Sequence, residues 1–203
     1  MDAGVLNAMD NSLREYYDRL KVFKRHGYDL IKARKFILDK SGIKGGNILE
    51  VGTGKGHTAI GLAERGIRFT TIDIDEKSLA VARHNLKAKG FLKYARIKRM
   101  DAEKLRFKDD TFDCVISVNF IHHAKHPKRC VKEMIRVAKS SVIVTDLNKR
   151  GEAVMDEIHR LDGREHEKSK MSLSEIKEFF RELGLSVKVY RDTCQTVFIA
   201  KKG

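Results

Sequence analysis

The chain has 203 residues, of which 41% are hydrophobic and 34% are charged, with 15 glycines and a single proline. This composition supplies enough apolar side chains for a packed core and excludes a disordered or fibrous chain. The 42 lysines and arginines outnumber the 28 aspartates and glutamates, which gives a formal charge of +14 with histidine neutral. Because domains run to roughly 100–200 residues, we expect residues 1–203 to form one domain.

The three cysteines, Cys114, Cys130 and Cys194, are widely separated and form no CxxC pair. This spacing argues against a disulfide framework and against a zinc or redox motif. The first residues contain acids and lack the basic and apolar regions of a signal peptide, and no apolar run approaches the ~20 residues of a membrane span. We therefore expect a protein of the reducing cytoplasm, with no membrane span.

Two amphipathic helices are predicted ahead of the first strand, over Asn11–His26 and Asp29–Lys40. Their apolar stripes contain Leu13, Tyr16, Tyr17 and Leu20 in the first helix, and Leu30, Ala33, Ile37 and Leu38 in the second. This spacing places each set on one side of its helix. We interpret residues 1–44 as an N-terminal helical extension of the domain.

Residues 45–146 alternate between short apolar runs and amphipathic stretches, which is typical of a parallel sheet covered by helices. The predicted strands are Asn47–Val51, Phe69–Asp73, Tyr94–Ile97, Phe112–Val118 and Val142–Thr145. The predicted helices are His57–Arg65, Ser78–Lys89 and Lys128–Ala138. In the helix over Ser78–Lys89 we expect the apolar residues Leu79, Val81, Ala82 and Leu86 on one side.

The pattern changes after Asp146. Residues 147–171 are charged, and Val154, Ile158 and Leu161 are spaced to line a short helix, so we interpret this segment as a lid-like insertion. In residues 172–203, Ser172 and Glu175 form a capping box ahead of a helix with Ile176, Phe179, Phe180 and Leu183 facing inward. Two strands follow, over Leu185–Tyr190 and Thr196–Ala200, and their short connection requires an antiparallel pair.

The predicted fold is therefore α/β and Rossmann-like: a seven-stranded, mostly parallel sheet with one antiparallel strand and helices on both faces. Its clearest motif is Glu50-Val51-Gly52-Thr53-Gly54-Lys55-Gly56, in which a strand runs into three alternating glycines and then a helix. Glycines let a ligand lie against the backbone while a helix N-terminus points at its negative end. The dinucleotide pattern GxGxxG would need a third glycine where His57 stands, and the P-loop pattern is absent.

Acidic residues follow the next two predicted strands at the same edge of the sheet. Asp73 is placed like the acid that binds both ribose hydroxyls of a nucleoside. Asp101 and Ala102 follow the third strand, where an acid can meet the exocyclic amine of adenine or, alternatively, cap a helix. The fourth strand ends at Asn119, on the edge where open α/β sheets bind ligands.

Residues 47–200 resemble the class I S-adenosylmethionine-dependent methyltransferases, most closely the small-molecule branch that includes the quinone-biosynthesis enzymes. The resemblance rests on the glycine motif and on the stretches Phe112-Asp113-Cys114-Val115-Ile116-Ser117, Ile121-His122-His123-Ala124 and Glu133-Met134-Ile135-Arg136-Val137. It implies S-adenosylmethionine as cofactor and S-adenosylhomocysteine as product. It also implies that the last strand is inserted between its neighbours in the sheet.

The resemblance further implies a set of cofactor-binding residues. By this resemblance, Gly52, Gly54 and Gly56 contact the methionine part of the cofactor. Asp73 binds the ribose, and Asp101 and Ala102 contact the adenine. Asn119 lies near the sulfonium, Glu50 steadies the glycine turn, and Thr53 and Ile74 complete the set. The chain departs from the family at Ala138-Lys139-Ser140-Ser141, where a Pro-Gly turn is common. It also lacks the Asn/Asp-Pro-Pro-aromatic signature of amino-group methylation on nucleic acid bases, which argues against base N-methylation.

His122 and His123 follow the fourth strand, and an imidazole pKa of about 6.5 suits a general base. Many methyl transfers need no base, so both histidines are also candidates for lining or structural roles. Adjacent histidines diverge, and no zinc-binding spacing is present, so we expect no metal site. We place the acceptor pocket between the N-terminal helices and the 147–171 insertion.

The basic charge leaves the partner open. Two clusters stand out: Lys87, Lys89, Lys93, Arg96, Lys98 and Arg99, and Arg14, Arg19, Lys21, Lys24, Arg25, Lys32, Arg34 and Lys35. They can serve as an electrostatic footprint for RNA, or reflect adaptation to high temperature. We favour a small-molecule acceptor, with an RNA methyltransferase and a non-catalytic cofactor-binding module as alternatives. The sequence does not indicate the oligomeric state.

Overall fold

The computed structural model describes residues 3–163, 165 and 169–203. Its strands are β1 (Ile48–Val51), β2 (Phe69–Asp73), β3 (Ala95–Arg99), β4 (Phe112–Val118), β5 (Ala138–Leu147), β6 (Ser186–Arg191) and β7 (Gln195–Lys201). Its helices are α1 (Ala3–Arg25), α2 (Leu30–Ser41), α3 (His57–Glu64), α4 (Glu76–Ala88), α5 (Pro127–Val137), α6 (Lys149–Leu161) and α7 (Leu173–Glu182), with short 3-10 helices η1 (Leu92–Tyr94) and η2 (Ile121–His123).

All seven strands form one sheet in the order β3-β2-β1-β4-β5-β7-β6. The pairs from β3 to β5 are parallel, and β7 is antiparallel to both β5 and β6. The predicted hairpin, its antiparallel sense and the insertion of the last strand between its neighbours are therefore confirmed. The α/β, mostly parallel fold class is confirmed as well.

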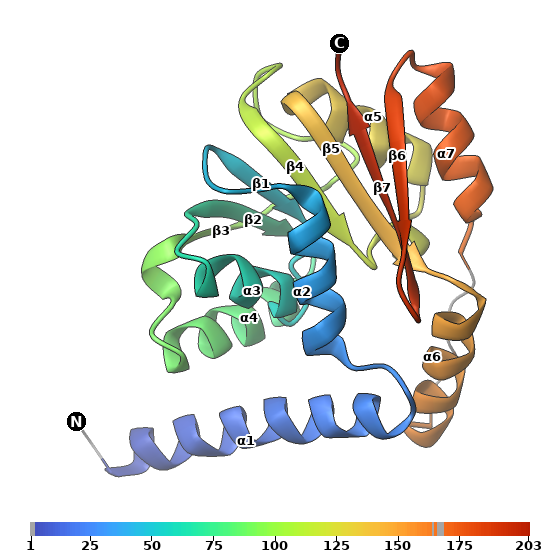
Figure 1. The fold of residues 1–203 in the computed structure, drawn as a ribbon. Coiled ribbons are helices and arrows are strands. Elements are labelled where there is room, and N and C mark those ends of the chain that lie inside the picture. Colours follow the sequence, from blue (N-terminus) through green and yellow to red (C-terminus); the bar gives the residue numbers. More distant parts are fainter. Residues whose placement is uncertain (1–2, 164, 166–168) are drawn as a thin grey trace.

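Helices cover both faces of the sheet, with α2, α3 and α4 on one face and α5 and α7 on the other (Figure 1). Alternate residues of the central strand β4 serve the two cores. Cys114 and Ile116 pack with Leu38 and Leu62 beneath α2 and α3, while Val115 packs in the opposite core. The strands thus bury both of their faces, which explains their nearly continuous apolar runs.

Several element boundaries differ from the predicted ones for local reasons. Helix α4 begins two residues early because the Asp75 side chain caps it, accepting hydrogen bonds from the backbone N–H groups of Lys77 and Ser78. Strand β5 begins at Ala138, because Ser141 still pairs with β4 and β7 despite the polar sequence there. The capping box of α7 is present as predicted.

A few apolar side chains expected in the core are exposed. Val81 is 42% exposed, Leu161 60%, Leu183 40% and Tyr17 44%. Leu161 and Leu183 stand at helix ends, where the apolar stripe has already turned away from the core. Val81 and Tyr17 instead line cavities beside α1, so their exposure belongs to the site described below.

Helix α1 lies across the end of the molecule toward which β4 and β5 point, with α6 beside its C-terminus (Figure 1). A third apolar cluster joins Leu20 and Phe23 of α1 to Val154 and Ile158 of α6. The side chains of Arg19 and Asp162 form an ion pair across the same contact. Among the described residues, no helix is long and apolar enough to cross a membrane.

Candidate active site

The glycine turn joins β1 to α3 and presents its backbone at the carboxyl edge of the sheet. A Cβ atom on Gly52, whose φ is +85°, would come within 2.6 Å of Phe120, so only glycine admits that ring. Gly54 has a φ of +50°, and a Cβ atom there would meet no heavy atom of the described residues within 4 Å. The backbone at Gly54 therefore borders open space that a ligand can occupy.

Asp73, at the end of β2, ties the glycine turn in place. Its Oδ2 accepts a hydrogen bond from the Gly54 N–H at 2.8 Å, and its Oδ1 accepts one from the Asp75 N–H at 3.0 Å. An ionised carboxylate offers about four lone-pair positions, so two backbone donors leave capacity for two more. Asp73 can hold the turn and bind a pair of ligand hydroxyls at the same time.

Beneath the turn, a buried chain of hydroxyl groups links β1 and β2. The Thr71 hydroxyl donates to Glu50 Oε2 at 2.6 Å, and the Thr53 and Thr71 hydroxyl oxygens are also 2.6 Å apart. Burial raises the pKa of Glu50 to about 8. Glu50 and Thr53 are both buried and line none of the cavities described below, so their side chains brace the turn from below.

A cavity of about 470 Å³ opens beside the turn and brings together Gly52, Asp73, Ile74, Asp101 and Ala102. These residues come from the ends of three adjacent strands, β1, β2 and β3. Its volume lies in the range of pockets that hold small ligands. The residues that the sequence placed around ribose and adenine therefore share one cavity, and the carboxylates of Asp73, Asp101 and Glu103 line it.

Asp101 lines this cavity and also caps a local turn. Its carboxylate lines the cavity, and its Oδ1 accepts a hydrogen bond from the Glu103 N–H at 2.8 Å. The segment it caps is a turn rather than a helix. Gly56 has a different part: a Cβ atom there would lie 3.2 Å from Ala82, so its missing side chain lets α3 start close to α4.

Asn119 follows β4 with a positive φ of +53° and holds a buried network of polar side chains. Its Nδ2 donates to the Tyr28 hydroxyl at 2.9 Å, and its Oδ1 accepts from Gln195 Nε2 at 3.1 Å. Gln195 also contacts the Tyr28 hydroxyl. Sequence analysis did not find Tyr28 or Gln195, because they lie far from Asn119 along the chain and form no motif.

The two candidate histidines face different surroundings. His122 is buried, and its Nδ1 lies 2.5 Å from Asp146 Oδ1 at the end of β5, while Asp146 Oδ2 accepts from the His122 N–H. His122 borders a separate cavity of about 30 Å³ near α7. His123 is exposed and lines the 470 Å³ cavity. Asp146 is a further residue that the sequence did not single out.

A larger cavity, of about 600 Å³, lies where α1 crosses the glycine turn. Its lining includes Tyr16 of α1, Lys55 and His57 of the turn, Val81 of α4, and Asp162. The N-terminal helix therefore lines this cavity, whereas the insertion contributes only Asp162 among the described residues; residues 164 and 166–168 lie outside them. The ring of His57 stacks on Tyr16, with centroids 5.0 Å apart.

Comparisons with known proteins agree with this arrangement. A family described as a methyltransferase domain matches residues 49–145. Phosphatidylethanolamine N-methyltransferase of Cereibacter sphaeroides is 34% identical over 52% of this chain and 51% of its own length. The ubiquinone/menaquinone biosynthesis C-methyltransferase of Pseudomonas fluorescens is 29% identical over 62% and 52%, respectively. The chain thus spans about half the length of these relatives.

The crystal structure of magnesium protoporphyrin IX methyltransferase from Synechocystis, solved with bound S-adenosylhomocysteine, superimposes with a TM-score of 0.65 at 17% identity, covering 86% of this chain and 82% of that one. This likeness in fold agrees with the family match, which includes the glycine turn and the end of β4. Residues 49–145 thus match the methyltransferase domain family, and the chain has the fold of the class I S-adenosylmethionine-dependent methyltransferases. Within this family fold, the described residues show no group of three His, Cys, Asp or Glu side chains that could hold a metal ion.

Proposed function

We propose that this methyltransferase-family chain transfers the methyl group of S-adenosylmethionine to a small molecule and releases S-adenosylhomocysteine. The observation that supports this most strongly is the 470 Å³ cavity lined by Gly52, Asp73 and Asp101. Asp73 also binds the backbone N–H of Gly54, which borders open space. An adenosine needs hydroxyl acceptors, an acceptor for its exocyclic amine and an apolar surface for its ring. Asp73 supplies the hydroxyl acceptors and Asp101 the acceptor for the amine. Ile74 and Ala102 supply the apolar surface for the ring.

The residues present fit this cofactor in detail. Asp73 keeps two acceptor positions for the ribose hydroxyls, and the unobstructed Gly54 backbone lets the amino-acid part lie against the turn. When bound, the cofactor supplies a methyl group activated by its positive sulfur. The protein's part is to hold the acceptor in line with that methyl, and such alignment is worth roughly 7–11 kcal/mol of barrier.

The candidate residues are divided between contact and support in this proposal. Gly52, Gly54, Asp73, Ile74, Asp101 and Ala102 contact the cofactor, while Glu50, Thr53 and Gly56 shape the turn. Asn119 orders the region near the sulfonium through Tyr28 and Gln195. His123, which lines the cavity, is the histidine placed to exchange a proton with a ligand, whereas His122 positions the end of β5 through Asp146.

A small-molecule acceptor is favoured by the relatives of this chain, which include a phosphatidylethanolamine methyltransferase and a quinone-biosynthesis methyltransferase. The net charge of +14 is the observation that keeps an RNA acceptor as the alternative. Calorimetry with S-adenosylhomocysteine tests the cofactor: absence of binding at near-millimolar concentration would contradict the proposal. Incubation with radiolabelled S-adenosylmethionine and fractionated cell extract then shows whether the label enters small molecules, RNA or nothing.

We also propose that residues 1–203 act as one domain in the cytoplasm. The apolar cluster shared by α1, α2 and α6 supports the first part, because the N-terminal extension and the insertion pack on each other and on β5. The three free, buried cysteines are compatible with a reducing compartment. Limited proteolysis and cell fractionation test the two statements.

A further inference from the structure

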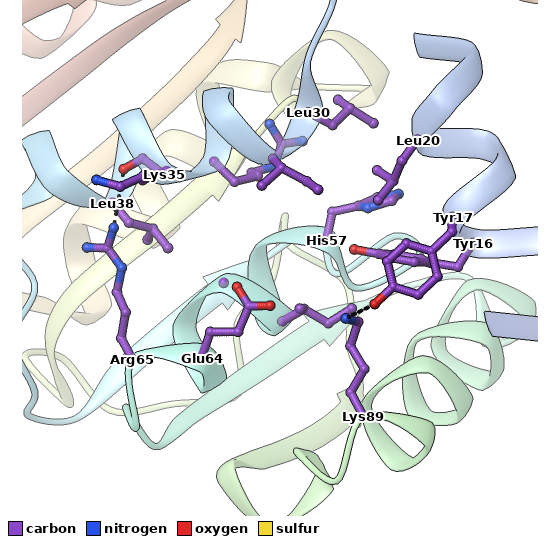
Figure 2. A pocket seen from close by; sticks show the side chains of 14 residues that line it. Tyr16, Tyr17, Leu20, Leu30, Lys35, Leu38, His57, Glu64, Arg65 and Lys89 are labelled. Carbon is purple, nitrogen blue, oxygen red and sulfur yellow. Dashed lines mark hydrogen bonds between the residues drawn. The ribbon is translucent and has the colours of Figure 1, made fainter. Parts of the chain in front are cut away.

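Another cavity lies between α1, α2 and α3. It shares the Tyr16–His57 stack with the 600 Å³ cavity. It measures about 300 Å³. Leu20, Leu30, Leu38 and Ile60 provide an apolar floor, and Tyr16 and His57 close the end next to the glycine turn (Figure 2). The floor is built on three helices that pack on one another, so the space belongs to the fold rather than to a loose loop.

Cationic side chains surround this apolar floor. Arg34, Lys35, Arg65 and Lys89 all line the cavity, against one lining carboxylate, Glu64. Lys35 and Arg65 both bind the carboxylate of Asp39. Lys89 donates a hydrogen bond to the Tyr17 hydroxyl at 2.7 Å. Among the described residues, neither Arg34 nor Lys89 forms an ion pair with a carboxylate, and Lys89 instead binds the Tyr17 hydroxyl.

The guanidinium of Arg34 is under-satisfied. Its Nε and Nη1 atoms are buried and have no hydrogen-bond partner among the described residues. Buried donors are costly unless an acceptor reaches them. Glu64 is the carboxylate that lines the same cavity, whereas three other nearby groups offer no compensating charge. Burial raises the pKa of Tyr16 to about 12 and that of Glu50 to about 8, and burial lowers the pKa of His57 to about 3. At neutral pH all three are uncharged.

We propose that this cavity holds the methyl acceptor, and that the acceptor is an apolar molecule whose anionic oxygen group, a carboxylate or phosphate, binds Arg34. The planar guanidinium matches both groups with paired N–H donors. The apolar part lies on Leu20, Leu30, Leu38 and Ile60. This inference rests on the proposed methyltransferase function, whose acceptor class it names.

The position of the cavity agrees with such a role. His57, at its inner end, follows Gly56 directly, so the cavity begins where the glycine turn ends. Burial raises the pKa of the Tyr28 hydroxyl, and the nearby positive charge of Arg34 opposes this rise. The same hydroxyl accepts a hydrogen bond from Asn119 at the end of β4. An anion on Arg34 would thus be held within the same group of side chains that orders the expected sulfonium region.

The experiment uses the absence of tryptophan from the chain. Ile31 lines the cavity mouth and is 60% exposed, so Ile31→Trp places a single fluorophore there with little risk to folding. Titration with octanoate, octyl phosphate and octanol compares two anions with a neutral molecule of the same chain length. We expect octanoate or octyl phosphate to bind at least ten-fold more tightly than octanol, and the tighter of the two identifies the anionic group.

Two further variants in the same background locate the anion. Arg34→Gln should lower the ratio of anion affinity to octanol affinity at least ten-fold. Lys32→Gln removes an equal charge from an exposed position of the same helix and should change this ratio less than two-fold. Glu64→Gln should strengthen octanoate binding. Should Arg34→Gln fail to fold, the comparison of anion with alcohol in the parent and the Glu64→Gln result still decide the question.

Several outcomes would overturn the proposal. Equal affinities for octanoate and octanol would refute the preference for an anionic group. Unchanged octanoate affinity in Arg34→Gln would refute the role of Arg34 in binding that group. If Arg34→Gln weakens S-adenosylhomocysteine ten-fold but leaves octanoate binding intact, Arg34 serves the cofactor's own carboxylate instead. Radiolabelled product from extract that does not bind an anion exchanger would refute the acceptor class. Failure of the parent to bind S-adenosylhomocysteine would refute the proposed function separately.

Discussion

Replacement of Asp73 by alanine should separate the carboxylate's two tasks. Its oxygens accept from the N–H groups of Gly54 and Asp75 and, in the proposed complex, from two ribose hydroxyls. Hydrogen bonds to a charged group contribute about 1.5–3 kcal/mol each, so loss of the ribose pair should cost about 3–6 kcal/mol of binding free energy. That range corresponds to a loss of affinity of at least about one hundred-fold.

The assay is calorimetric titration with S-adenosylhomocysteine, together with urea unfolding of the same samples. Asp75→Ala is the matched control, because it removes an equal charge two residues away and leaves the Lys77 and Ser78 N–H groups uncapped. Loss of this cap should lower the free energy of unfolding by about 0.5–2 kcal/mol and leave cofactor affinity within three-fold. Wild-type affinity in Asp73→Ala, or an equal loss of affinity in Asp75→Ala, would refute the assignment.

Three further predictions follow from the same contacts. Gly54→Ala and Gly66→Ala both force alanine into a positive φ with open space around the new Cβ, so each variant should lose about 1–2 kcal/mol of stability. Only Gly54→Ala should also lose S-adenosylhomocysteine binding in calorimetry. Equal binding by both variants would contradict the open approach of a ligand to Gly54. Because the pKa of Glu50 is raised to about 8 by burial, only the unfolded chain releases this proton between about pH 4.5 and 8, and stability should fall with rising pH in that window. Glu50→Gln should flatten that part of the urea-unfolding profile, and an unchanged slope would show that Glu50 is ionised in the fold. Tyr28→Phe should cost about 1–3 kcal/mol in thermal unfolding, because Asn119 Nδ2 loses its buried acceptor, and full wild-type stability would argue against the network.

Much of the fold could be predicted because its determinants are local. The strands Phe69–Asp73 and Phe112–Val118 match the predicted bounds, since each is a mostly buried run that stops at, or directly before, a polar residue (Asp73 and Asn119). The antiparallel hairpin followed from the length of its connection alone. Where a polar residue continues a strand, as at Ser141 in β5, pairing with both neighbouring strands decides the boundary, and no local sequence pattern indicates it.

The predicted site residues share a related property. Asp73, Asp101 and Asn119 each follow a strand, and parallel strands deliver their carboxyl ends to one edge of the sheet, so chain order alone placed them near one another. Asp73 and Asp101 do line one cavity, but which contacts each makes depends on side chains from elsewhere. Arg34 and Tyr28 come from the N-terminal extension, where helical periodicity predicts a face and not a partner.

The two sides of the glycine turn have opposite character, and this difference explains how the site can be both rigid and receptive. Below the turn, Glu50, Thr53 and Thr71 are buried and satisfy one another's hydroxyl and carboxyl groups. Above it, Gly54 borders open space, and Arg34 carries buried donors with no acceptor among the described residues. A support without unmet polar groups resists rearrangement, whereas unmet donors beside an apolar floor gain most from an anionic ligand. Ligand binding therefore needs to complete only the upper side of a turn whose lower side is already fixed by the fold.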